Sequence, residues 1–253
     1  MIPDDCTQHI EPFLGGGAVL FGLHPKRAII NDYNEELVNL YRVIGDNPSE
    51  LIKELEIHAN NDSFDYFYKI RAYDRDTNIY NAMSDVEKAA RTLYLNKTCY
   101  NGLYRVNKSE QFNTSYGRYK NPDIVSAKAI REISNYLNDN DIEIRSDDYK
   151  NILDNVNNNS FVYLDPPYMR ISNSSSFTGY TADGFDADRQ AELKEKCDEL
   201  SERGVRFLQS NSDCEYIREL YKNYNIKTVN AKRNINCKAN GRNSLNELII
   251  YNY

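Results

Sequence analysis

The segment Ser160–Tyr168, Ser-Phe-Val-Tyr-Leu-Asp-Pro-Pro-Tyr, constrains the fold of this chain more than any other. Phe161–Leu164 is a short apolar run rich in β-formers, which is typical of a strand buried on both faces. The two prolines that follow cannot continue a central strand, because neither has an N–H to donate and both have a fixed φ. We therefore predict a sharp turn at the carboxyl end of this strand, where ligands bind in open α/β sheets.

The chemistry of this turn suits an exocyclic amine on a heteroaromatic ring. Such an amine is a poor nucleophile, because its lone pair is delocalised into the ring. The Asp165 carboxylate and the Pro166 carbonyl, on a backbone stiffened by Pro167, would accept its two hydrogens and favour a tetrahedral nitrogen, while Tyr168 stacks on the ring. The stretch therefore indicates methyl transfer to an amine. The alternative is a turn in which Asp165 only caps a helix.

Composition excludes several classes of protein. The chain has 253 residues, enough for one α/β domain with an insertion, and its 40% hydrophobic and 12% aromatic content is typical of a globular protein. It has no apolar run of membrane-spanning length and no signal pattern, so we expect no membrane association. The five cysteines are widely spaced and lack a Cys-x-x-Cys pair, which favours free thiols in a reducing cytoplasm and no metal site.

Basic residues concentrate in two windows of a chain whose net charge is −7. Residues 96–131 contain seven Lys or Arg against two acids, and residues 227–246 contain five against none, so each window carries +5. Both are rich in Asn, Ser and Tyr, which suits contacts to phosphates and bases. The alternative is a pair of ordinary solvated faces.

Two further strand ends carry groups suited to an adenosine-containing cofactor. A strand reaching about Phe13 precedes three glycines and a helix that begins near Ala18. The next strand, 28–32, ends at Asp32, which can bind both ribose hydroxyls or cap the helix 35–44, a task that Asn34 could equally perform. After a strand at 141–145, an Asp can accept from an adenine amino group; a surface turn is the alternative.

The remaining elements follow from periodicity, caps and turn residues. The three histidines lie in no cluster and are interpreted as structural. The polar segment 169–185 is a candidate lid. We expect helices over 48–83, 84–95, 123–137, 188–203 and 215–224, the second of them opened by the capping box Ser84–Glu87. A strand over 205–209 should stop at Ser210. We also expect a basic, aromatic hairpin within 96–121 and a hairpin of 226–235 with 245–251 around Asn240-Gly241.

In this order the motifs resemble those of the Dam-like, D12-class DNA adenine-N6 methyltransferases over nearly the whole chain. The blocks that carry the resemblance are Glu11–Gly17, Asn31-Asp32, Tyr100–Asn107, Tyr116–Lys120, Asp165–Tyr168, Ser210–Asp213, Arg233–Asn236, Arg242 and Glu247–Ile250. The resemblance implies an α/β fold of the class I SAM-dependent methyltransferase type, a Rossmann-like sheet with an antiparallel last strand. It further implies a catalytic domain of residues 1–47 and 139–253, with an inserted, mainly helical target-recognition domain, 48–138.

The resemblance also implies the ligands and the residues that bind them. S-adenosylmethionine would be the methyl donor and N6 of a flipped adenine in double-stranded DNA the acceptor, with no metal. The target base would be held by Asp165, Pro166, Pro167 and Tyr168. The cofactor would contact Glu11, Phe13, Gly15, Gly17, Asp32, Asp148, Tyr149 and Asp165. DNA would contact Asn101, Leu103, Arg105, Asn107, Arg118, Tyr119, Lys120, Arg233 and Arg242.

Several alternatives stay open at this point. The match at Leu103, Arg105, Asn107 and Tyr119 leans the target toward GATC, although Tyr104, Val106 and Ser115 differ from the best-known members. Rival functions are a cytosine-N4 DNA methyltransferase, a glutamine-amide methyltransferase, which usually carries Asn in place of Asp165, and a catalytically impaired DNA-binding fragment. A cognate restriction endonuclease acting on the same site is a candidate partner, and we expect a monomer or weak dimer.

The start of the chain gives one more expectation. The family usually begins with a further segment that closes over the donor, and here ten residues precede Glu11. We expect residues 1–253 to bind the cofactor more weakly than a version extended at the N-terminus, which calorimetric titration of both would test.

Overall fold

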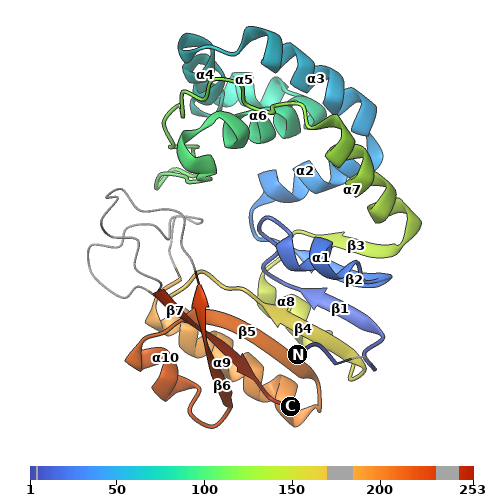
Figure 1. Ribbon diagram of the computed structural model, residues 1–253, viewed down its shortest axis with the longest axis vertical. Helices are drawn as coiled ribbons and strands as arrows, with labels where there is room; N and C mark the ends of the chain where they lie inside the picture. The colour runs from blue at the N-terminus through green and yellow to red at the C-terminus, as the bar shows by residue number, and fades with distance from the viewer. Residues whose placement is uncertain (4, 170–184, 232–244) are drawn as a thin grey trace. The chain divides into compact units, whose positions relative to one another are not determined.

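The computed structural model describes residues 1–3, 5–169, 185–231 and 245–253, and their strands form a seven-stranded mixed sheet (Figure 1). The strand order is β3-β2-β1-β4-β5-β7-β6. The strands are β1 (Gln8–Glu11), β2 (Arg27–Asn31), β3 (Asp141–Arg145), β4 (Ser160–Leu164), β5 (Arg206–Ser212), β6 (Asn225–Ala231) and β7 (Leu245–Tyr251). β1 pairs in parallel with β2 and β4, and β4 with β5, whereas β7 is antiparallel to both β5 and β6. The predicted α/β class and antiparallel last strand are confirmed.

The chain divides into two compact units, described separately below. Unit 1 comprises Met1–Tyr33 and the described residues from Asp147 onward, and unit 2 comprises Asn34–Ser146. The predicted insert, 48–138, lies inside unit 2. The assignment of catalysis and target recognition to separate domains stays a prediction.

Unit 1 packs its helices against apolar strand residues. Its helices are α1 (Ala18–Leu23), α8 (Tyr149–Asp154), α9 (Ala187–Glu202) and α10 (Glu215–Leu220). Val162 and Leu164 of β4, both 0% exposed, share one hydrophobic core with residues of these last three helices, including Ile152, Leu193 and Ile217. Phe161, on the opposite face of β4, is 2% exposed, so the strand is buried on both faces as predicted.

Unit 2 is mainly helical. Its helices are α2 (Glu35–Asp46), α3 (Pro48–Asn61), α4 (Phe64–Arg71), the 3-10 turn η1 (Ala72–Arg75), α5 (Thr77–Ala82), α6 (Asp85–Thr98), η2 (Tyr100–Gly102) and α7 (Ala127–Asp139). The predicted capping box is present, since Glu87 N–H donates to the Ser84 hydroxyl and the Glu87 carboxylate accepts from Ser84 N–H. The helix predicted over 48–83 is several shorter helices, because Ser63 and Asp76 cap new starts within it.

Several helices and strands end at residues other than the predicted ones. β1 ends at Glu11, before the expected Phe13, because Pro12 has no N–H to continue the strand pairing. β5 continues through Ser212 instead of stopping at Ser210, since β7 pairs with it along its whole second half. α10 ends at Leu220 rather than at 224. The antiparallel pairing of β6 with β7 is confirmed, while the turn at Asn240-Gly241 and the candidate lid at 170–184 lie outside the described residues.

Candidate active site

The Asp-Pro-Pro-Tyr corner begins immediately after β4, where the two prolines led us to predict a turn. Asp165 Oδ1 accepts a 2.6 Å hydrogen bond from the Ser210 hydroxyl of β5. The Tyr168 hydroxyl lies 3.4 Å from Glu247 Oε2 on β7. These contacts join three neighbouring strand ends, and Asp165 remains exposed to solvent. The corner is therefore a fixed structure with an accessible carboxylate.

Three buried polar side chains hold the main chain that follows the corner. Gln190 of α9, 0% exposed, donates to the Pro167 carbonyl at 3.0 Å. Asn211 Oδ1 accepts from Met169 N–H at 3.2 Å, and the Ser212 hydroxyl donates to the Met169 carbonyl at 2.8 Å. We call Gln190, Asn211 and Ser212 the corner contacts. Since buried polar groups cost free energy unless they are paired, their bonds to the backbone define one conformation of the corner.

Sequence reasoning missed the role of the corner contacts. The resemblance had included Ser210–Asp213, but the predicted end of β5 placed these residues beyond the strand. A run of small polar residues that continues an apolar strand was the available signal. Gln190 offered no signal at all, because it lies within an ordinary amphipathic helix.

Acidic groups surround the corner. The Asp165 carboxyl group is surrounded by protein atoms although the residue keeps solvent-accessible surface, and this burial raises its pKa; the Ser210 hydrogen bond lowers it, and the nearby Glu247 raises it again. Burial also raises the pKa of Glu11, whose carboxylate lies 2.9 Å from His9 Nε2. Burial and then Asp165 raise the pKa of Tyr163 to about 12. The arrangement suits a positively charged or hydrogen-donating ligand.

The glycine turn and Asp32 come together as predicted. Gly15 N–H donates to Asp32 Oδ2 at 2.9 Å. Gly15 and Gly17 have φ values of 51° and 65°, a conformation that favours glycine. A Cβ built on Gly15 would meet none of the described residues within 4 Å. Asn34, not Asp32, caps α2, which removes the capping alternative for Asp32.

A residue that sequence reasoning named only through the resemblance connects this turn to a third segment. Asn31, 1% exposed, donates from Nδ2 to the carbonyls of Pro12 and Asp147, both at 3.0 Å. Its Oδ1 accepts from Asp147 N–H at 2.9 Å. One buried amide therefore fixes the distance between the glycine turn and the segment that carries Asp148.

The two cofactor candidates after β3 differ in their surroundings. Asp148 caps α8 by accepting from Lys150 N–H at 2.9 Å. Tyr149 is buried, and its ring lies 5.1 Å from that of Phe13 between centroids. Among the described residues, nothing hydrogen-bonds the buried Tyr149 hydroxyl. The structure therefore brings the predicted Phe13 and Tyr149 together, while one oxygen of Asp148 serves the helix.

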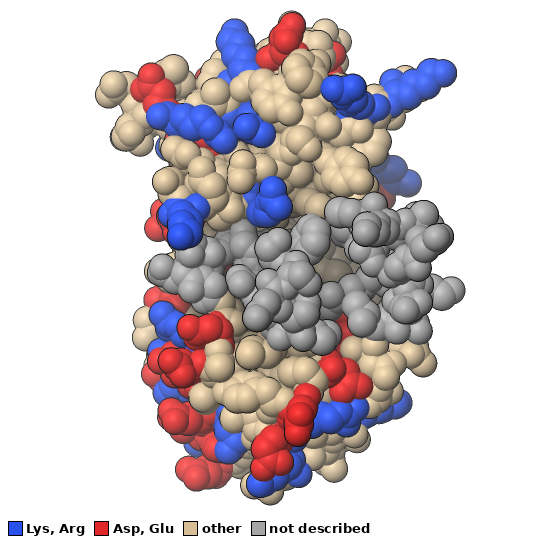
Figure 2. Space-filling model, turned by 90° about the vertical axis from the view of Figure 1, so that its left-hand side faces the viewer, with Lys and Arg blue, Asp and Glu red and all other residues tan. Residues whose placement is uncertain are grey.

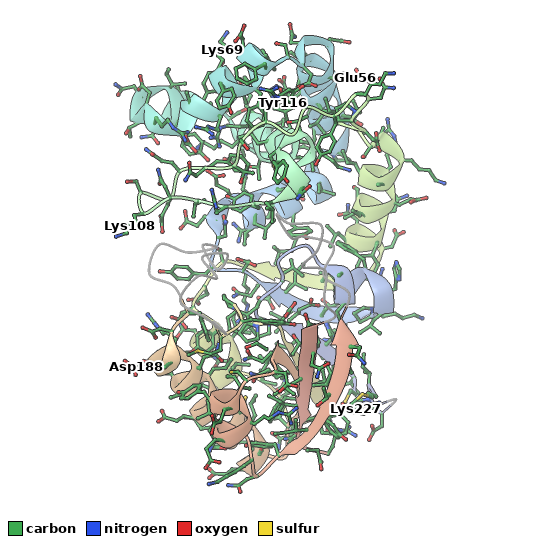
Figure 3. All side chains as sticks on the ribbon, turned by 60° about the vertical axis from the view of Figure 1, so that its left-hand side comes forward. Glu56, Lys69, Lys108, Tyr116, Asp188 and Lys227 are labelled. Atoms are coloured by element: carbon green, nitrogen blue, oxygen red, sulfur yellow. The ribbon has the colours of Figure 1, made fainter. Side chains whose placement is uncertain are left out.

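The candidate DNA-binding segment of unit 2 is an irregular loop rather than the expected hairpin of strands. It contains two isolated antiparallel bridges, Cys99 with Tyr116 and Val106 with Phe112. Asn107 forms the turn between them, since its Oδ1 accepts from the N–H groups of Ser109 and Gln111. Figure 3 shows Lys108, at the tip of this turn, pointing away from the helices of unit 2.

The other end of the segment presents aromatic and basic groups. Tyr119 is exposed, and its hydroxyl accepts from Asn101 N–H at 2.8 Å. The Arg118 guanidinium lies 5.6 Å from the centre of the Phe64 ring. Lys120 is exposed, Leu103 and Arg105 are half-buried, and Arg233 and Arg242 lie outside the described residues. On the face in Figure 2, Lys and Arg side chains project from unit 2.

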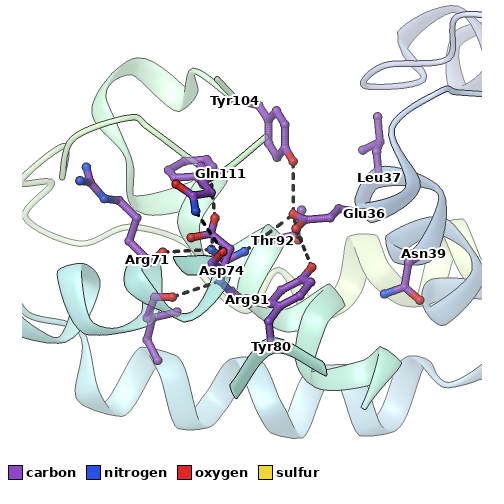
Figure 4. Close-up of polar contacts among 12 residues, drawn as sticks. Glu36, Leu37, Asn39, Arg71, Asp74, Tyr80, Arg91, Thr92, Tyr104 and Gln111 are labelled. Carbon is purple, nitrogen blue, oxygen red and sulfur yellow. Dashed lines mark hydrogen bonds and ion pairs between the residues drawn. The ribbon is translucent and has the colours of Figure 1, made fainter. Parts of the chain in front are cut away.

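A buried ionic network holds this segment on the helices of unit 2 (Figure 4). Arg91 of α6, 1% exposed, binds Asp74 at 2.7 Å and lies 3.7 Å from Glu36. Glu36 accepts from the hydroxyls of Tyr80 at 2.5 Å and Tyr104 at 3.2 Å. Asp74 accepts from the backbone N–H of Phe112 at 2.7 Å. The segment is thus linked to Arg91 at two points: Tyr104 binds Glu36, and Phe112 binds Asp74.

Comparisons with known proteins identify a family that the sequence resembles over most of its length. The sequence profile of the D12 class N6 adenine-specific DNA methyltransferases matches residues 1–235. Type II methyltransferase M1.LlaDCHI of Lactococcus lactis subsp. cremoris is 44% identical over 253 residues, which are 100% of this chain and 89% of that protein. Type II methyltransferase M.MjaIII of Methanocaldococcus jannaschii is 41% identical over 98% of this chain and 89% of its own length. The DNA adenine methylase of Escherichia coli strain K12 is 30% identical, with 97% and 89% covered.

Proposed function

The chain belongs to the D12 class of N6 adenine-specific DNA methyltransferases, and we propose that it methylates N6 of a flipped adenine in duplex DNA, with S-adenosylmethionine as donor. The observation that carries the proposal is the fixed corner. Ser210 holds the Asp165 carboxylate, and Gln190 holds the Pro167 carbonyl, at the end of a central parallel strand. This is the end of the sheet at which ligands bind.

The residues of unit 1 fit the proposed cofactor. The main chain from Phe13 to Gly17 suits the methionine part, and Asp32 at the end of β2 suits the ribose hydroxyls. Phe13 and Tyr149 offer apolar rings for the adenine. When bound, S-adenosylmethionine supplies a methyl group on a positively charged sulfonium, a charge that the acidic surroundings of Asp165 complement.

The corner residues act on the target amine by position and polarisation. The Asp165 carboxylate and the Pro166 carbonyl accept the two amine hydrogens, which draws the nitrogen toward a tetrahedral geometry with an available lone pair. Tyr168 stacks on the base. Extrusion of the base from the duplex costs a few kcal/mol. Ser210 holds the Asp165 carboxylate, and the corner contacts hold the neighbouring main chain at Pro167 and Met169 before the base arrives, so little reorganisation is needed during the reaction.

Target recognition is assigned to the segment 101–120 of unit 2. Arg105 is suited to a guanine edge, and Arg118 and Lys120 to phosphates. The resemblance at Leu103, Arg105, Asn107 and Tyr119 favours GATC as the recognition site. Two of the relatives are named Type II methyltransferases. This supports a partner restriction endonuclease that cleaves the same unmodified site.

Incubation of the protein with plasmid DNA and methyl-labelled donor tests the proposal. We expect label in N6-methyladenine, loss of transfer in Asp165→Ala with DNA binding retained, and normal transfer in the matched control Asp154→Ala on the exposed end of α8. Full turnover by Asp165→Ala would overturn the mechanism, and label in N4-methylcytosine would establish the rival function. Modification-sensitive sequencing of DNA from expressing cells then reports the recognition site.

Among the helices in the described part of the chain, none has the length and apolar character needed to cross a membrane.

A further inference from the structure

Ser210 differs from the corner contacts because it binds a side chain rather than the backbone. Its hydroxyl lies 2.6 Å from Asp165 Oδ1 but 3.5 Å from the Leu164 carbonyl. Hydrogen bonds to an ionised acceptor are shorter and about twice as strong as neutral ones. The residue is only 4% exposed. The hydroxyl therefore donates to the Asp165 carboxylate.

We propose that Ser210 is a positioning residue for methyl transfer: by holding one oxygen of Asp165, it orients the carboxylate toward the target amine and favours its ionised form. This inference rests on the proposed function of Asp165. A carboxylate has about four lone-pair positions, so the serine takes one of them and the carboxylate can still accept from the amine. Without this bond the carboxylate would be free to rotate away from the amine, which would leave the Pro166 carbonyl as the acceptor for both amine hydrogens.

The electrostatic surroundings make this bond important. The charged groups in the described residues that face Asp165 are acidic, namely Glu247 on β7 and Glu11 on β1, and two phenols, Tyr163 and Tyr168, lie beside it. Burial and Glu247 raise the pKa of Asp165, whereas the hydrogen bonds from Ser210 and Tyr168 lower it. Loss of the serine hydroxyl should therefore raise this pKa further.

Single-turnover methyl transfer as a function of pH tests the inference in Ser210→Ala. We expect a rate about tenfold to a hundredfold lower, an acid limb moved to higher pH, and an unchanged affinity for DNA. Ser210→Thr, which keeps the hydroxyl, should restore the acid limb. The control is Ser212→Ala, an equally buried serine of the same strand whose hydroxyl binds the Met169 carbonyl.

An acid limb that stays at its original pH in Ser210→Ala, or moves equally in Ser212→Ala, overturns the inference. A carbon-13 titration of the Asp165 carboxyl provides a readout that does not depend on turnover. If the unaltered chain transfers no methyl group, the proposed function fails. The titration still shows whether Ser210→Ala raises the pKa of Asp165; no change there overturns the role of Ser210 separately.

Discussion

Arg91 is a buried cation of unit 2, 1% exposed, and its replacement by Met should strongly destabilise the protein. The guanidinium donates to Asp74 and, at 3.1 Å each, to the carbonyls of Ile70 and Arg71. Met keeps most of the apolar volume but removes the buried cation beside Asp74 and the guanidinium donors to the two carbonyls. Removing one partner of a buried ion pair costs about 3–5 kcal/mol.

Urea unfolding followed by circular dichroism measures the loss, since the chain has no Trp. With a slope of about 3 kcal/mol per molar urea, the midpoint should fall by about 1–1.7 M. The control is Lys128→Met, which removes an exposed cation of α7 that lies 3.7 Å from Glu132. An exposed pair contributes about 1 kcal/mol at most, so this midpoint should move by no more than about 0.3 M.

A double-mutant cycle separates the ionic interaction from packing. Asp74→Asn removes the charge of the first partner, and the double variant should be less destabilised than the sum of the two single variants by about 0.5–3 kcal/mol. If Arg91→Met shifts the midpoint no more than Lys128→Met, or if the two changes are additive, the network does not stabilise unit 2 in the way described.

Three other predictions concern the site and the segment. Asp165→Asn should raise the free energy of unfolding at neutral pH, because the pKa of Asp165 is raised in the folded state. This gain should vanish below the ordinary pKa of 3.8, where the carboxyl group is protonated in the folded and the unfolded state. Thermal melts at neutral pH and below pH 3.8 check this. Asn31→Ala should weaken cofactor binding by about tenfold in calorimetry, since two backbone contacts across the site are lost; unchanged affinity would contradict it. Tyr104→Phe should reduce discrimination against a site with one base changed, while Tyr80→Phe, which also loses a bond to Glu36, should leave discrimination intact; equal effects would argue against a role for the network in recognition.

Local patterns predicted the parts of the fold that depend on neighbours in sequence. The capping box at Ser84 and the abrupt end of β4 at Leu164 follow from residue types that act within a few positions, whereas the sequence left the cap of α2 open between Asp32 and Asn34. The pairing of Gly15 with Asp32 was also predictable, because parallel strands bring their carboxyl ends to one edge of the sheet.

Contacts between distant segments were not predictable in the same way. Gln190 reaches Pro167 across 23 positions, and Ser210 reaches Asp165 across 45. Nothing in the immediate sequence of α9 distinguishes Gln190 from a polar residue on a surface, and the run of small polar residues in β5 does not show which group Ser210 binds. Only the packing of helix on sheet shows that they are buried, and burial then requires that their polar groups have partners.

The corner contacts bind main-chain atoms, so the shape of the corner does not depend on which ring stands at position 168. Tyr168→Phe would keep a ring at this position and the main-chain bonds of the corner contacts, and would lose the contact of the hydroxyl with Glu247. Different residues therefore determine the path of the backbone and the ring that the corner presents.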